Sequence, residues 1–278
     1  MNNFDLHCHS TISDGLLAPR DLVRRAAANG VELLALTDHD HLGGLAEARD
    51  EADVLGVRFV DGVEVSVSWG GLTIHVVGLG VDAANARLAQ GLAGVRQGRD
   101  SRALQMADSL AASGIRGAYE GALRYVGNPA LVSRSHFARW LVEMRYARSV
   151  ANVFEHYLLR GKPGYVEHQW CSLDEAVDWI HSAGGVAVVA HPGRYRMSGS
   201  ERDRMFNAFK ALGGDAIEVV AGAHDLAAVR EYAHVARKYG FAASRASDFH
   251  GPGESAVDVG RAASLPSDLE PIWERLAA

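Results

Sequence analysis

Cysteine is nearly absent from this chain of 278 residues, which contains only Cys8 and Cys171. Two cysteines cannot build the disulfide framework of a small secreted protein, so we expect a reducing compartment, the cytoplasm. Long apolar runs are absent as well, and the first residues lack the basic and apolar pattern of a secretory signal. We therefore expect no membrane-spanning segment and no export.

Positive charge is also in short supply, because 28 basic residues stand against 34 acidic ones and leave a formal net charge of -6. This balance argues against bulk electrostatic binding of nucleic acid, but it is compatible with a local basic pocket for a small anion. Histidine, by contrast, is abundant at 13 residues, several of them next to acids. Neutral imidazole is the commonest protein metal ligand, so this enrichment favours metal chemistry.

Patterns typical of strands and helices alternate along most of the chain. Strands are expected from residue 4 and over 33–37, 58–67, 72–79, 186–190, 216–220 and 241–246. Helices are expected over 19–29, from just after Gly43-Gly44 to about residue 55, from 172 to about 184, and over 201–212, 225–239 and 269–278. Seven strands in this alternation predict an α/β barrel, whose functional residues collect at the carboxyl ends of the strands.

One segment, from residue 98 to 165, breaks the alternation and predicts a helical insert that is also locally basic. Most of its arginines are expected on solvated helix faces, although a few are candidates for gripping phosphate. The helices expected here and just before it cover 82–113 (as one or two), 135–144 and 147–159, with irregular structure over 114–129. The predicted domains are a first barrel part (1–97), the insert (98–165) and a second barrel part (166–278).

Side chains of the kinds that bind metal ions follow or end five of the predicted strands and occur inside a sixth. They are His7, His9, Asp14, His39, Glu64, His75, His191, Asp248 and His250. His7 and His9 are two apart in an extended segment, so they point to the same side. Each residue alone is more often an ordinary buried or surface group, but a barrel brings strand ends into one mouth. So many nitrogen and oxygen ligands exceed one tetrahedral ion and fit two or three ions, with a carboxylate such as Glu64 as the bridge.

The same motifs carry a resemblance to a known family. In chain order they are His7-x-His9, Thr37-Asp38-His39-Asp40, Glu64, Ala190-His191-Pro192 and Ser247-Asp248-x-His250. This order resembles that of the polymerase and histidinol phosphatase (PHP) family within the amidohydrolase superfamily, and it extends over nearly the whole chain. The resemblance implies a distorted seven-stranded (β/α) PHP barrel, which agrees with the strand count.

The resemblance also implies how the ligands divide among the ions. One ion would be held by His7, His9, Glu64 and Asp248, a second by Glu64, His75 and His191, and a third by Asp14, His39 and His250. Some relatives have histidine where Asp14 stands, and a carboxylate there favours Mn²⁺ or Mg²⁺ over Zn²⁺. We therefore expect two or three divalent ions, with Mn²⁺ as the first choice and Mg²⁺, Zn²⁺ or Fe²⁺ as alternatives.

Within the family, the chain is most similar to a small stand-alone branch with a helical insert. The segments that carry this likeness are Ser133-Arg134-Ser135-His136-Phe137-Ala138 and Ala190-His191-Pro192-Gly193-Arg194-Tyr195. Members of the branch release the 3'-phosphate of nucleoside 3',5'-bisphosphates, and some trim short RNA from the 5' end. The resemblance implies such an activity on a small nucleotide, with no obligate protein partner.

Two other functions stay open at this point. One is a different phosphoesterase, for instance a histidinol-phosphate phosphatase or a nuclease that acts on longer strands. The acidic net charge argues against the nuclease. The other is a non-enzymatic metal-binding scaffold, which would be expected to have lost ligands of the set.

Proton transfer at such a site has several candidates among the named residues. Asp248 or another carboxylate is a candidate acceptor for the proton of the attacking water. His191, His224 and metal-bound water are candidate donors to the leaving alkoxide, and the sequence does not choose among them.

Phosphate binding has candidates in both parts of the chain. Arg194 directly follows the fifth strand and is the candidate for holding the phosphate under attack. A bisphosphate needs a second anion-binding site, and the insert could cover the mouth of the barrel. The candidates for this second site are Arg134, Ser135 and Lys162.

Overall fold

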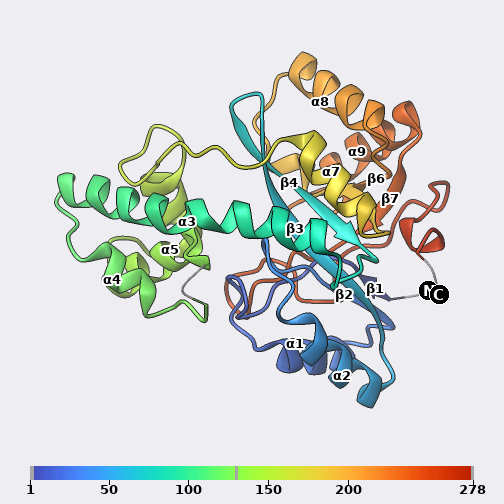
Figure 1. Cartoon of the computed structure of the whole chain (residues 1–278), viewed down its shortest axis with the longest axis horizontal. Helices are drawn as coiled ribbons and strands as arrows, with labels where there is room; N and C mark the ends of the chain where they lie inside the picture. The colour runs from blue at the N-terminus through green and yellow to red at the C-terminus, as the bar shows by residue number, and fades with distance from the viewer. Residues whose placement is uncertain (1–2, 129–130, 277–278) are drawn as a thin grey trace.

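The computed structural model describes residues 3–128 and 131–276, and its strands form one barrel-like sheet (Figure 1). The strands are β1 (Phe4–Asp5), β2 (Leu33–Leu36), β3 (Arg58–Trp69), β4 (Leu72–Leu79), β5 (Val186–Val189), β6 (Ala216–Val220) and β7 (Ala242–Arg245), paired in this order. Beyond β1 and β7 the chain pairs again, because the Leu6 N–H donates to the Arg245 carbonyl at 3.2 Å and the Asp248 N–H to the His7 carbonyl at 2.9 Å. The expected seven-stranded barrel is confirmed.

The strand β4 is the source of the distortion, because it runs antiparallel to both β3 and β5. It follows β3 through a two-residue turn at Gly70 and Gly71, whose φ angles of 56° and 76° suit a hairpin turn. The register places His75 opposite Ser66, two residues beyond Glu64. A histidine inside a strand therefore reaches the barrel mouth, since this strand enters the sheet from the mouth side.

Helices cover the barrel, as expected for strands that are buried on both faces. They are α1 (Pro19–Ala28), α2 (Leu45–Leu55), α7 (Leu173–Ser182), α8 (Gly199–Ala211) and α9 (Leu226–Tyr239). Figure 1 shows α1 and α2 on one side of the sheet and α7 to α9 on the other. Within the described ranges, no helix is both long enough and apolar enough to cross a membrane.

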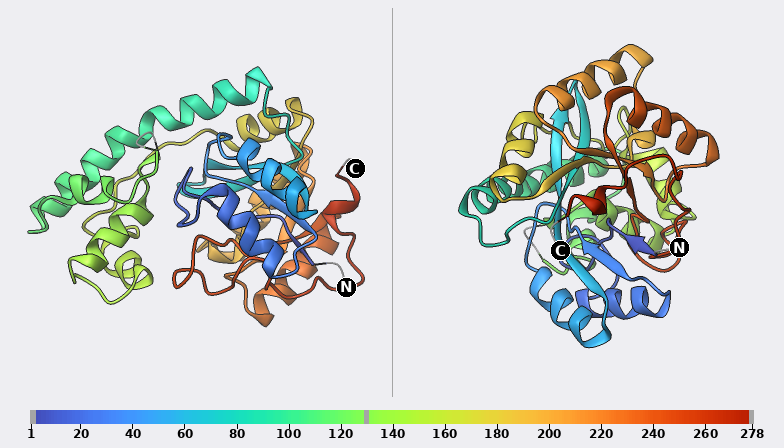
Figure 2. Two further views of the ribbon diagram at one scale, coloured as in Figure 1. Left: turned by 90° about the horizontal axis from the view of Figure 1, so that it is seen from below. Right: turned by 90° about the vertical axis from the view of Figure 1, so that its right-hand side faces the viewer.

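The insert consists of helices that lie to one side of the barrel (Figure 2) and have a hydrophobic core of their own. Its elements are the second half of α3 (Ala86–Ala112), α4 (Ala118–Leu123), α5 (Arg134–Glu143), α6 (Val150–Val153) and a π-helical turn (Phe154–Leu158). The first half of α3 packs Leu88 and Leu92 into the barrel core, and the second half packs Met106 and Leu110 into the insert core. The predicted boundary at 97/98 therefore falls inside one continuous helix.

Three expectations about elements were wrong. The glycine-rich stretch 114–129 contains α4, and its residue 129 lies outside the described residues. Of the helix expected over 147–159, only Val150–Val153 is α-helical, and a π-helical turn over Phe154–Leu158 follows it directly. The helix expected over 269–278 is only a 3₁₀ turn at Ile272–Glu274, with 277–278 outside the described residues. Proline favours an extended chain here, and the Glu270 carbonyl accepts the Ala243 N–H at 2.8 Å, so this segment lies beside β7 instead.

Candidate metal centre

Glu64 on β3 is at the centre of the histidine cluster and is completely buried. Its two carboxylate oxygens divide the surrounding imidazoles between them. Oε1 is 2.8 Å from His75 Nδ1 and 2.9 Å from His191 Nε2, and Oε2 is 2.8 Å from His39 Nδ1, 3.3 Å from His7 Nε2 and 3.4 Å from His9 Nε2. A carboxylate between two sets of imidazoles has the geometry of a bridging ligand.

Asp248 closes the cluster on the β7 side. Its Oδ1 is 3.3 Å from His9 Nε2 and 3.6 Å from both His7 Nε2 and His250 Nδ1, while its Oδ2 is 2.7 Å from Arg194. Asp248 has φ 53°, a left-handed conformation that is strained for a non-glycine residue and recurs at functional sites. The backbone hydrogen bond to His7 holds this conformation.

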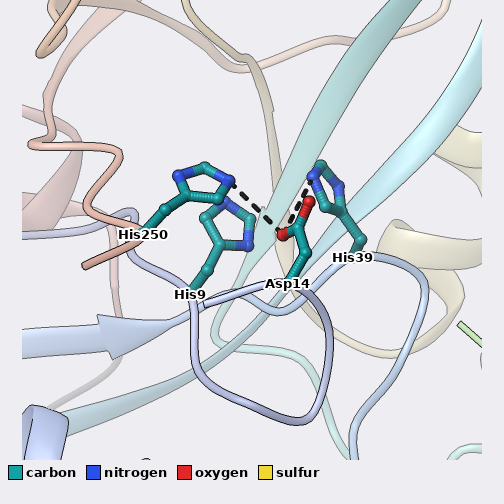
Figure 3. A group of neighbouring side chains, drawn as sticks. All are labelled: His9, Asp14, His39 and His250. Carbon is teal, nitrogen blue, oxygen red and sulfur yellow. Dashed lines mark ion pairs between the residues drawn. The ribbon is translucent and has the colours of Figure 1, made fainter. Parts of the chain in front are cut away.

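Asp14, His39 and His250 form a third group, which Figure 3 shows together with His9. Asp14 Oδ1 is 3.4 Å from His250 Nε2 and 3.8 Å from His39 Nε2. One ring nitrogen of His9 and the ligand atoms of Asp14, His39 and His250 all lie within 4.8 Å of one another. His9 therefore faces this group as well as the group of His7 and Asp248. The structure thus brings all the predicted ligand residues together, with His9 and His39 between neighbouring groups.

The donor set fits divalent cations. Several buried carboxylate oxygens form no hydrogen bond among the described residues, namely Asp14 Oδ1, Glu64 Oε2 and both oxygens of Asp248, although Asp248 Oδ2 is ion-paired with Arg194. Buried carboxylates are costly unless cations or hydrogen bonds compensate them. Imidazole nitrogens and carboxylate oxygens are the ligands that Zn²⁺, Fe²⁺ and Mn²⁺ accept.

The protonation states suit metal binding. Burial lowers the pKa of His9 to about 3 and that of His75 to about 4, so both imidazoles are neutral near pH 7. Burial alone would raise the pKa of Glu64, but the charges of His75, His39 and His7 outweigh it and hold that pKa well below its ordinary value. His9, His75 and Glu64 are therefore in the forms that bind cations. Burial alone would lower the pKa values of His7, His39 and His250, but the neighbouring carboxylates raise them, so a bound cation would displace protons from these imidazoles.

Glu218 on β6 is a functional residue that the sequence reasoning missed. Its Oε1 accepts the His7 Nδ1–H at 2.7 Å, and its Oε2 accepts the His191 backbone N–H at 2.6 Å. Because a carboxylate can only accept these protons, His7 is held with Nε2 directed to the cluster. The signal in the sequence was a single acid within the apolar strand AIEVV, and the structure shows that every residue of this strand is buried.

A cavity of about 150 Å³ opens above the cluster, and the insert forms part of its wall. Its lining includes Arg194, Arg134 and Ser135, three of the four candidates for phosphate binding. It also includes Arg99 and Arg102, which were counted among the mostly solvated arginines but are only 5% and 7% exposed. Ser133, Phe154 and Trp170 also line the cavity, and its floor is formed by residues of the cluster such as Glu64 and Asp248.

The two additional arginines differ in their partners. Arg99 pairs with Asp40, whereas Arg102 has no ion pair among the described residues and its Nε has no hydrogen-bond partner there. Both guanidinium groups lie over the Trp170 ring, at 4.8 Å and 5.2 Å from its centroid. Burial and the nearby charges of Arg134 and Arg99 lower the pKa of Arg102 to about 9, so an anion in the cavity would stabilise its charged form.

Two predicted residues do not line the cavity. Lys162 is exposed in the turn after the π-helical segment. His224 accepts the Gly193 N–H at its Nε2 and donates from its Nδ1 to the Val219 carbonyl, both at 3.0 Å. With both ring nitrogens bonded to the backbone, His224 is placed to fix the segment before Arg194 rather than to transfer a proton.

Comparisons with known proteins agree with this geometry. The PHP domain model matches residues 5–96. A 3',5'-nucleoside bisphosphate phosphatase from Chromobacterium violaceum is 52% identical over 278 residues, which is 100% of this chain and 98% of that protein. A 5'-3' exoribonuclease from Salmonella typhimurium is 42% identical over 273 residues, which is 98% of this chain and 92% of that protein. A solved structure of a C. violaceum amidohydrolase with bound sulfate and no metal has a TM-score of 0.96 at 52% identity and covers 99% of this chain and 95% of that one. The chain therefore belongs to the PHP family.

Proposed function

We propose that this protein is a metal-dependent phosphatase that hydrolyses the 3'-phosphate of nucleoside 3',5'-bisphosphates. The observation that carries the proposal is Arg102, a buried arginine without an acidic partner among the described residues, in the same cavity as the histidine and carboxylate cluster. A substrate with one phosphate at the cluster leaves this charge uncompensated, whereas a second phosphate would pair with it. The similarity to a protein named for this activity supports the same substrate class.

The chain's own residues supply binding and proton transfer. When bound, divalent ions at the cluster would act as Lewis acids and lower the pKa of water. Arg194, 2.7 Å from Asp248, is placed to hold the phosphate that is cleaved. Burial alone would raise the pKa of Asp248, but the charges of Arg194, His250 and His7 keep it well below its ordinary value. Asp248 is thus ionised and can accept a proton. His191 Nε2 faces Glu64 as a candidate metal ligand, and both ring nitrogens of His224 are bonded to the backbone, which leaves water as the candidate donor to the leaving alkoxide.

We further propose the identity of the ions and the ligand roles. His7, His9, Glu64 and Asp248 would hold one ion, Glu64, His75 and His191 a second, and Asp14, His39 and His250 a third. Mn²⁺ is our choice for these positions because Asp14 adds a carboxylate to an imidazole-rich set. The cytoplasm, with its reduced thiols and nucleotides, is the compartment that fits the two free cysteines.

A second candidate activity is removal of nucleotides from the 5' end of short RNA. The 42% identity to a protein named as a 5'-3' exoribonuclease favours it. A terminal 5'-phosphate would pair with the same arginines as the 5'-phosphate of a bisphosphate. Histidinol phosphate, by contrast, carries one phosphate and a cationic amine, which the arginine-lined cavity disfavours. A scaffold without activity is disfavoured because every predicted ligand residue is present.

Phosphate release from a panel of substrates tests the proposal. The panel is adenosine 3',5'-bisphosphate, AMP, histidinol phosphate and a short 5'-phosphorylated RNA, each with Mn²⁺. We expect rapid release from the bisphosphate, and little from AMP or histidinol phosphate. No release from the bisphosphate while histidinol phosphate turns over would overturn the proposed function.

Arg102→Met tests the observation that carries the proposal. We expect kcat/KM for adenosine 3',5'-bisphosphate to fall about 10- to 100-fold, because a charge-assisted hydrogen bond to phosphate contributes about 1.5–3 kcal/mol. For adenosine 3'-monophosphate, which lacks the second phosphate, kcat/KM should change little. Arg116→Met, at an exposed arginine of the same insert, is the control. An equal fall in kcat/KM for both substrates would contradict binding of the second phosphate by Arg102.

A further inference from the structure

The insert contacts the loops that carry two of the candidate ligand residues, Asp14 and His250. Arg139, in the second turn of α5, is only 5% exposed. Its Nε and one terminal nitrogen each donate to a carboxylate oxygen of Glu254 at 2.8 Å, and that terminal nitrogen also donates to the Asp14 carbonyl. One guanidinium group therefore joins α5, the Asp14 loop and the loop after β7.

The Asp14 side chain is held by the same helix. The Ser133 hydroxyl, at the N-cap of α5, is 3.1 Å from Asp14 Oδ2 and donates to it. Ser133 is itself fixed, since its backbone N–H donates to His136 Nδ1 at 3.0 Å in a capping box. With Oδ2 bonded to the insert, Asp14 Oδ1 remains directed to His39 and His250.

Two more contacts fix the loops on either side. A Cβ atom at Gly127 would lie 2.4 Å from the Thr11 carbonyl oxygen, so the insert packs directly on the loop before Asp14. In the loop after β7, the His250 N–H donates to the Ser255 hydroxyl at 2.7 Å, next to Glu254. The fork from Arg139 to Glu254 thus acts on a segment that is bonded to His250.

The Asp14 group depends on outside support more than the Glu64 group does. The distances from Asp14 Oδ1 to its histidine neighbours are 3.4 and 3.8 Å, whereas Glu64 has three imidazole nitrogens at 2.8 to 2.9 Å. Glu64 is in a strand, where the backbone ladder fixes it, but Asp14 is in a loop. Ligand geometry that neighbouring ligands do not set must be set by residues behind them.

We propose that Arg139 is a positioning residue for the outer ion position formed by Asp14, His39 and His250, so that the insert controls occupancy of this position alone. This inference rests on the metal centre of the proposed function. It assigns the insert a second role besides lining the cavity. The ions grouped around Glu64 would keep their affinity without Arg139, because their ligands come from the barrel strands and their loops.

The test is the number and affinity of Mn²⁺ ions bound by the full-length protein, measured by equilibrium dialysis and elemental analysis. We expect three ions in the wild type. Arg139→Met and Arg139→Lys, which lose the fork, should retain two ions and bind the third 10- to 100-fold more weakly. Ser133→Ala, which removes one hydroxyl behind Asp14, should have the same selective effect. Arg124→Met is the matched control, since Arg124 pairs with Glu143 at 2.8 Å on the insert surface.

The outcomes separate this inference from the proposed function. Three ions bound with wild-type affinity by both Arg139→Lys and Ser133→Ala would overturn it. Loss of all ions in these two variants, with cooperative unfolding retained, would also overturn it, because the effect would not be selective. If the wild type bound only two ions, the outer ion position and this inference would be refuted, but the proposed phosphatase activity would not. If the wild type bound three ions but did not hydrolyse the bisphosphate, the proposed function would be refuted instead.

Discussion

At the scale of single residues, the site depends on two acids, Glu218 and Asp5, that are not proposed as metal ligands. They hold the residues and segments that carry the proposed ligands. Glu218 sets the orientation of His7 and of the His191 backbone. Asp5 accepts the Ser247 N–H at 2.9 Å and the Gly260 N–H at 2.6 Å, which anchors the segment before Asp248. These acids are buried and bonded to residues more than 20 positions away.

The candidate ligands could be predicted from the sequence, and the acids behind them could not. His7 and His9 follow from the two-residue period of an extended chain, and Asp248 from its place directly after a strand. Glu218, however, is a single acid inside a strand, and its role depends on pairing across the barrel with His7. Arg102 was missed as a buried residue because helix periodicity does not reveal which face the insert turns to the cavity.

Glu218→Gln should weaken metal binding without removing a ligand. The amide is nearly the same size but lacks the negative charge that holds the His7 imidazole, so we expect Mn²⁺ affinity to fall about 10- to 100-fold. The affinity is measured by calorimetric titration of the metal-free protein. Glu143→Gln, at an exposed surface pair, is the control. Unchanged affinity in Glu218→Gln would show that Glu218 does not tune the centre.

At the scale of elements, α3 shows how one helix can connect two cores. Its glycines form three different environments along one face. A Cβ atom at Gly91 would lie 2.4 Å from the Trp179 ring, and one at Gly98 would lie 2.5 Å from the His168 ring, whereas nothing lies within 4 Å of a Cβ at Gly94. Close ring contacts therefore explain two of the glycines, and the third has only its conformational freedom.

Alanine substitutions in α3 should change stability in opposite directions. Gly91→Ala places a methyl group against the indole and should destabilise the protein by about 1–3 kcal/mol. Gly94→Ala meets open space and should stabilise it by about 0.5–1 kcal/mol, since alanine loses less backbone entropy in a helix. The free energy of unfolding in urea measures both effects. Stabilisation by both substitutions would contradict the close packing of α3 on Trp179.

Element types were predictable where the pattern was long and regular. The strands and the helices α1, α2, α7, α8 and α9 match their predicted ranges to within about two residues. The errors occur where tertiary contacts override local preference, as in the segment of Pro271, which bridges to Ala243 of β7. The short helix α4 was missed because glycines suggested a loop, although its Ala118 and Ala122 are buried in the insert core.

At the scale of the whole molecule, the barrel brings residues from both ends of the chain into one cluster. This convergence followed from the strand order alone, because parallel strands of a barrel share one mouth. The sequence suggested that the insert could cover the mouth, and insert residues do line the cavity above the cluster. The contacts that fix the insert there, such as that of Arg139 with Glu254, did not follow from the sequence. The continuous helix α3 also shows that the insert is not a separate unit joined by a loop.

Crystals of the protein soaked in Mn²⁺ would test the central claim most directly, through anomalous diffraction at the manganese edge. We predict two anomalous peaks that share Glu64 as a ligand and a third between Asp14, His39 and His250. Arg194 should then be released from Asp248, whose oxygens would face an ion. The absence of any peak at the barrel mouth, or peaks that do not contact Glu64, would contradict a metal-dependent phosphatase built on this cluster.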